Sequence, residues 1–175
     1  MFKRLALVLA CTFTLTAGSP ELVDEYKVKA AFIYNFAKFL VWPAKVFNGP
    51  ADPVSICILG DDPFHGALEQ ATSGKSVEGR GFSVRHLSNT DSGSNCQILF
   101  VSASGRKRFH ALAENLKSGS VLSIGESPGF AAEGGILNFK VESGRVRFEI
   151  NVQAAEQQQL QISSKLLSLA EIVKR

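Results

Sequence analysis

Residues 54–63 read VSICILGDDP, an apolar run followed by a turn and the start of a helix. Aspartate suits a helix cap and proline suits the first helical position, so we predict a strand over Val54–Leu59 and a helix over Pro63–Ala71. Residues 96–102 read CQILFVS and repeat the apolar run, with a second helix predicted over Gly105–Lys117. A strand followed by a helix, found twice, is typical of an α/β fold.

The flanking sequence extends this pattern on both sides. Further strands are predicted at Phe82–Leu87 and Ser120–Ile124, a hairpin over Ile136–Val141 and Arg145–Asn151, and an amphipathic helix over Ser163–Val173. In the hairpin, Val146, Phe148 and Ile150 should share one face, with Arg145, Arg147, Glu149 and Asn151 on the other. The fold class is therefore a single-domain α/β structure, with a mixed central sheet, helices on both faces, and a C-terminal hairpin plus helix.

A long helix is predicted over Leu22–Leu40, where apolar residues recur at helical spacing before Trp42-Pro43 ends it. Phe32, Phe36 and Phe39 widen its apolar face to most of the circumference. Such a helix is either deeply buried or in contact with a partner.

The first 18 residues have the parts of a secretory signal. Lys3 and Arg4 precede a short apolar stretch, and Thr16-Ala17-Gly18 offers small residues for cleavage. A membrane anchor, or a lipoprotein site at Cys11, is the alternative, but the stretch is short for either. We expect residues 1–18 to be removed and residues 19–175 to form an exported, periplasmic domain with no direct membrane insertion.

Removal of the leader changes the cysteine and charge counts. Cys57 and Cys96 become the only cysteines, and two cysteines in an exported domain suggest one disulfide. Each lies in a predicted core strand, and neighbouring strands can bring two Cα atoms within about 7 Å. A pair of buried free thiols is the alternative. Without Lys3 and Arg4 the basic and acidic residues fall to 17 against 16, so no nucleic-acid role follows from charge.

No motif in the chain predicts catalysis. Asp61, Asp62 and His65 resemble metal ligands, but a helix cap explains the aspartates and nothing completes the set. Ser104 and Lys107 have the spacing of some acyl-transfer enzymes, without the supporting motifs. Residues 106–108 read RKR at a helix start, where cations oppose the dipole, so a small anion or acidic-partner site is an alternative to simple solvation. We expect no enzyme, no cofactor and no metal.

The whole pattern resembles the YfiR family of bacterial periplasmic proteins. The matching segments follow one order: YKVKAAFIYNFAKF (26–39) before Trp42-Pro43, ICILGDDPF (56–64), CQILFVS (96–102), Phe130–Phe139 with Gly134-Gly135 and Asn138, VRFEIN (146–151), Ala154-Ala155, and LQISSKLL (160–167).

This resemblance implies a non-enzymatic repressor. Its partners would be an inner-membrane diguanylate cyclase like YfiN, held inactive, and an outer-membrane lipoprotein like YfiB, which sequesters the repressor; a homodimer is also implied as possible. Cyclic di-GMP and biofilm formation would be the outputs. Cys57 and Cys96 match the family's cysteine pair, whose oxidation supports folding and activity. A second, closely spaced pair known in some members is absent, because residues 131–138 contain no cysteine.

The resemblance also implies candidate site residues. Glu149, with Phe139 and Leu160, matches a surface near the final hairpin that is linked to repression, although core packing is the favoured explanation for Phe139 and Leu160. The N-terminal helix lies near lipoprotein-binding and dimer surfaces in the family, which would give Phe32, Phe36 and Phe39 a partner. A periplasmic small-molecule sensor or carrier, with a pocket near the hairpin or the basic helix start, remains the alternative function.

Overall fold

The computed structural model describes residues 20–88, 90–116 and 119–173. The predicted export signal, residues 1–18, lies outside the described residues. The helices are α1 (Pro20–Lys38), α2 (Ala67–Thr72), α3 (Arg106–Leu116), α4 (Val152–Gln157) and α5 (Ser164–Leu167), with short 3-10 turns at Ala44–Val46 and Ala103–Gly105.

A seven-stranded sheet forms the centre of the fold, in the order β3-β2-β4-β5-β6-β7-β9. Its strands are β2 (Val54–Leu59), β3 (Phe82–His86), β4 (Ile98–Val101), β5 (Leu122–Gly125), β6 (Leu137–Glu142), β7 (Arg145–Asn151) and β9 (Glu171–Val173). The strands from β3 to β6 are parallel, and the β6–β7 hairpin is antiparallel. This arrangement confirms the predicted mixed sheet and α/β class.

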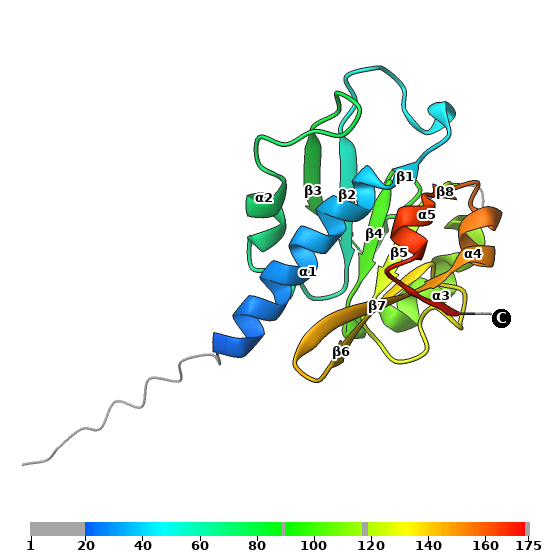
Figure 1. Ribbon diagram of the computed structural model, residues 1–175. Helices are drawn as coiled ribbons and strands as arrows, with labels where there is room; N and C mark the ends of the chain where they lie inside the picture. The colour runs from blue at the N-terminus through cyan, green and yellow to red at the C-terminus, as the bar shows by residue number, and fades with distance from the viewer. Residues whose placement is uncertain (1–19, 89, 117–118, 174–175) are drawn as a thin grey trace, which may run out of the picture.

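Each face of the sheet carries its own hydrophobic core. Ile56 and Ile58 of β2 point into the larger core beneath α1, whereas Cys57 and Leu59 point into a smaller core beneath α3. Figure 1 shows α1, α2 and α5 across one face, with α3 behind the sheet. Burial on both faces explains why β2 and β4 read as continuous apolar runs rather than alternating ones.

The helix after β2 begins later than the sequence predicts. We predict a start at Pro63, but α2 begins at Ala67. Asp62 caps a local turn instead, because its Oδ1 accepts from the backbone N of Phe64 at 2.8 Å. The helix then follows Gly66, whose φ of 89° suits glycine.

The prediction of a C-terminal helix over Ser163–Val173 is largely wrong. Ser163 does cap a helix, since its Oγ accepts from the backbone N of Leu166 at 3.3 Å, but α5 ends at Leu167. The chain continues into β9, which pairs in parallel with β7, placing Ile172 beside Ile150. An open edge on β7 would leave backbone groups unpaired, and the β-branched Ile172 and Val173 suit a strand.

Two further features escape the sequence prediction. A two-stranded ribbon joins β1 (Leu40–Val41) to β8 (Gln161–Ile162), and α4 follows β7 directly. Asn151 makes the second feature possible: its Oδ1 accepts from the backbone N of Ala154 at 2.9 Å, and its Nδ2 donates to the carbonyl of Ala131 at 2.8 Å. The side chain is 1% exposed, so these bonds fix the end of the hairpin inside the protein.

The loop after β5 is held in place by Phe130. Its ring packs on Phe109 of α3 with centroids 4.7 Å apart, and it occupies the space where Gly125 and Gly135 lack side chains. A Cβ on Gly125 would lie 2.3 Å from Cγ of Phe130, so a larger residue does not fit there. This packing positions Glu126 at the end of β5.

Candidate functional site

The disulfide joins strand β2 to the segment that leads into the neighbouring strand β4. The Sγ atoms of Cys57 and Cys96 are 1.95 Å apart, and their Cα atoms are 5.9 Å apart. Both cysteines are buried, in the core beneath α3. The bridge therefore lies inside the protein, away from direct contact with solvent.

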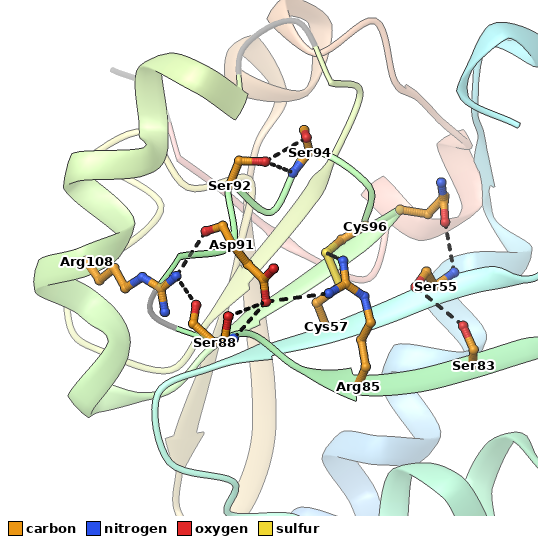
Figure 2. Close-up of a disulfide and its surroundings, with 11 residues drawn as sticks. Ser55, Cys57, Ser83, Arg85, Ser88, Asp91, Ser92, Ser94, Cys96 and Arg108 are labelled. Atoms are coloured by element: carbon orange, nitrogen blue, oxygen red, sulfur yellow. Dashed lines mark hydrogen bonds and ion pairs between the residues drawn. A yellow bond between two sulfur atoms is a disulfide. The ribbon is translucent and has the colours of Figure 1, made fainter.

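Arg85 of β3 lies beside this bridge (Figure 2). Its Nη2 donates to Sγ of Cys96 at 3.4 Å, and its Nη1 lies 3.8 Å from Oδ2 of Asp91. Asp91 also accepts from the backbone N and the hydroxyl of Ser88, and these hydrogen bonds, with the neighbouring arginines, lower the pKa of its carboxyl. The disulfide thus has a cation at one sulfur.

Arg108 connects the same loop to α3. Its Nη2 donates to the carbonyl of Asp91 at 2.9 Å and to the carbonyl of Ser88, as Figure 2 shows. The segment between β3 and β4 is therefore tied to the bridge through Arg85 and to α3 through Arg108.

An open groove of about 640 Å³ lies between the N-terminal half of α1 and the β6–β7 hairpin. In Figure 1 the hairpin, in orange, extends beyond the neighbouring strands on the side where α1 begins. We call this feature the acidic groove, and its lining is Glu25, Tyr26, Lys29, Ala103, Glu126, Pro128, Gly129, Asn138–Glu142 and Glu149.

The hairpin wall of the groove centres on Glu149. Its carboxylate accepts from Nδ2 of Asn138 at 3.1 Å and lies 3.9 Å from Nζ of Lys140. Lys140 is engaged more closely by Glu142 at 3.0 Å and by Glu171 at 2.6 Å. The pKa of Lys140 is raised, first by its hydrogen bonds to those two glutamates. Glu149, whose side chain is 12% exposed, keeps the weakest pairing of the three carboxylates.

The helix wall of the groove centres on Lys29. Its ammonium lies 2.6 Å from Glu25 and 2.8 Å from Glu126, although its side chain is only 4% exposed. The hydroxyl of Tyr26 donates to Glu126 at 3.1 Å. Burial, and then the charge of Glu126, raises the pKa of Tyr26. A buried lysine is tolerated here because two carboxylates and an aromatic ring surround it.

The structure separates the predicted site residues into two groups. Glu149 and Phe139 line the acidic groove, and Phe32 and Phe36 pack behind it against Phe139. Phe36 and Phe139 are buried, so their side chains contribute to the core.

The remaining two predicted residues lie at the other end of α1. Leu160 is 3% exposed in the main core and precedes β8 directly, whereas Phe39 precedes β1 and is half-buried, with Nζ of Lys165 5.7 Å from its ring. The β1–β8 ribbon brings these two segments together. Of the predicted partner-contact residues, only Glu149 and Phe139 line the acidic groove.

Sequence reasoning missed Tyr26, Lys29, Glu126 and Asn138. One signal was present: Lys29 interrupts an otherwise apolar helix face and has Glu25 four residues before it. Glu126 carried no such signal, because it lies 97 residues from Lys29 and reaches it only through the fold.

The two other motifs act locally. Asp62 caps its turn and lies 3.7 Å from Nε2 of His86, and no group of three metal-binding side chains occurs within the described residues. At the start of α3, Arg106 pairs with Glu133 and Arg108 holds the neighbouring loop. Lys107 is exposed.

Known protein families include one whose model matches most of this chain. A family model described as YfiR/HmsC-like matches residues 26–171. The chain belongs to this family. No curated protein matches the sequence significantly.

Solved structures share the fold of this YfiR/HmsC-like chain at low identity. A conserved domain protein from Vibrio cholerae O1 biovar El Tor is 10% identical, with a TM-score of 0.58 over 85% of this chain and 60% of that one. The ABC domain from Streptococcus pneumoniae, solved with L-Trp, is 9% identical, with a TM-score of 0.51 over 74% of this chain and 57% of that one. The chain therefore spans somewhat less than two thirds of either structure, and the likeness concerns the fold.

Within residues 20–88, 90–116 and 119–173, no helix is both long and apolar enough to cross a membrane.

Proposed function

We propose that this chain is a periplasmic repressor that holds an inner-membrane diguanylate cyclase of the YfiN type inactive, and that an outer-membrane lipoprotein of the YfiB type relieves the repression. Family membership over residues 26–171 supports the signalling role. Low cyclic di-GMP, and with it reduced biofilm formation, would be the output. In this proposal the export signal at residues 1–18 delivers the protein to the periplasm.

The observation that carries this proposal is the position of Glu149. It lies in an open groove, on strand β7 of the hairpin that extends beyond the neighbouring strands, and its nearest cation is 3.9 Å away. A carboxylate without a close ion pair, reachable from solvent, is available to a partner protein. Phe32, Phe36 and Phe139 would support the groove from within, while the half-buried Phe39 would lie nearer the lipoprotein surface.

The disulfide gives the repressor a dependence on oxidation. The bridge between Cys57 and Cys96 closes a loop of 39 residues and links β2 to the start of the neighbouring strand β4, so reduction of the bridge would weaken the fold that presents the groove. Because the chain has no second cysteine pair in the described residues, this one bridge would carry any redox control.

Deletion and complementation in a host with the cognate cyclase test the proposal. Loss of the gene should raise cyclic di-GMP severalfold, and the wild-type gene should restore the low level. Glu149→Lys should fail to restore it, whereas Glu156→Lys, the same change at an exposed residue of α4, should restore it. Unchanged cyclic di-GMP on deletion would contradict the repressor role.

A further inference from the structure

The acidic groove has more negative than positive groups. Four carboxylates line it, from Glu25, Glu126, Glu142 and Glu149, against two ammonium groups, from Lys29 and Lys140. Both lysines are already engaged by closer carboxylates than Glu149. The lining of the groove therefore carries excess negative charge, which would be neutralised in part by one more cation near Glu149.

Asn138 supplies an independent sign of a missing ligand. Its side chain lines the groove and is 1% exposed, yet Oδ1 has no hydrogen-bond partner among the described residues. The orientation of this amide is fixed by its neighbour, because Glu149 can only accept and so must face Nδ2, at 3.1 Å. The carbonyl oxygen is left unpaired, which is rare for a buried polar atom.

We propose that the acidic groove binds an arginine side chain of the partner protein, with the guanidinium donating to the Glu149 carboxylate and to Oδ1 of Asn138. The proposed function supplies the identity of that partner, the periplasmic part of the cyclase; the binding chemistry stands on the groove alone. One guanidinium presents five N–H donors in a plane, so it can satisfy a carboxylate and a neighbouring carbonyl together.

Arginine fits this arrangement better than lysine. Its flat guanidinium is more weakly hydrated than an ammonium and so is less costly to bury beside side chains that are themselves mostly buried. The ring of Tyr26 also lines the groove and offers apolar surface to the arginine stem.

Binding can be measured on the mature protein by amide-resolved NMR titration. The probes are acetyl-Gly-Arg-Gly-amide, its citrulline counterpart, which keeps the shape without the charge, its lysine counterpart, and free L-arginine amide. We expect saturable shifts at residues 126, 138–140 and 149 with the arginine peptide. The citrulline peptide and the Glu149→Gln variant should each weaken binding at least tenfold, the lysine peptide severalfold, and Glu156→Gln should have no effect.

Equal binding of the citrulline peptide, or unchanged binding in Glu149→Gln, would overturn the inference. Tighter binding of free L-arginine amide than of the peptide would also overturn it, because the groove would then select a small molecule. These results are separate from the repression assay. A repressor whose groove ignores arginine refutes only this inference, and a groove that binds arginine in a protein without effect on cyclic di-GMP refutes only the proposed function.

Discussion

Arg85 donates a hydrogen bond to Sγ of Cys96 at 3.4 Å, so the guanidinium cation lies beside this sulfur of the disulfide. Cys57 pairs with Arg85 across β2 and β3, which fixes this relationship in the register of the sheet. When local opening exposes the buried Cys57 and a reductant attacks its sulfur, the Cys96 thiolate leaves next to the guanidinium of Arg85. Stabilising a leaving thiolate speeds thiol–disulfide exchange.

Arg85→Gln should therefore slow reduction of the bridge by dithiothreitol severalfold. Quenching with an alkylating reagent and counting modified cysteines by mass gives the rate. The rate for Arg85→Lys, which keeps the positive charge, should lie between the rates of the wild type and Arg85→Gln. Faster reduction of Arg85→Gln than of the wild type would show that Arg85 shields the bridge rather than activating it.

Cys57→Ser should lower the free energy of unfolding. Closure of a loop of 39 residues is worth about 4 kcal/mol in the chain-entropy description, and measured values are often smaller. Urea denaturation in oxidising buffer measures the difference, and the fully reduced wild type is the control, since it should approach the variant. Equal stability of variant and oxidised wild type would mean that the bridge does not constrain the fold.

Asn151→Ala should destabilise the protein by about 2 kcal/mol, because it removes the cap of α4 and leaves the buried carbonyl of Ala131 without its donor. Urea denaturation is again the measurement. Gln153→Ala, at an exposed position two residues later, is the matched control and should change stability by less than about 0.5 kcal/mol. Similar losses in both variants would contradict the role of the Asn151 side chain.

Tyr26 should make the fold sensitive to alkali. Its pKa is raised above the ordinary value of 10.0, by burial first and then by Glu126, so the folded state holds the phenolic proton more tightly than the unfolded state. The resulting contribution to stability is complete below pH 10 and is lost as the pH rises toward the folded-state pKa. Unfolding free energies measured between pH 9 and pH 11 should fall more steeply for the wild type than for Tyr26→Phe. Parallel curves for the two proteins would contradict this.

The sequence predicts those parts of the fold whose signals are local. Val54–Leu59 is β2 to the residue, because an apolar run bounded by Pro53 and Gly60 has few alternatives. The pattern of residues 163–173 predicts a helix wrongly, because their apolar residues recur at helical spacing. The structure of this segment is decided instead by pairing with β7, about 20 residues earlier. A three-residue edge strand has too little local pattern to compete with that periodicity.

The candidate site is predictable only in part for the same reason. Strand alternation predicts that the side chain of Glu149 points away from the main core, and in the structure Glu149 lies outside that core. Alternation cannot show that Asn138 lies opposite Glu149, or that Lys29 and Glu126 form the facing wall, since these contacts join residues from three distant segments. Residues predicted from their apolar character, such as Phe36 and Phe139, lie mainly in the core, which is the commoner place for phenylalanine.

The most direct test of the repressor role is the rate of cyclic di-GMP synthesis by the cognate cyclase in lipid nanodiscs, where both of its faces are accessible, as purified mature protein is added. The wild type should lower the rate to a saturable minimum, and Glu156→Lys should do the same. Glu149→Lys, folded by circular dichroism, should leave the rate unchanged. A rate that stays constant as wild-type protein is added, up to concentrations well above those of the cyclase, would contradict the proposed repression.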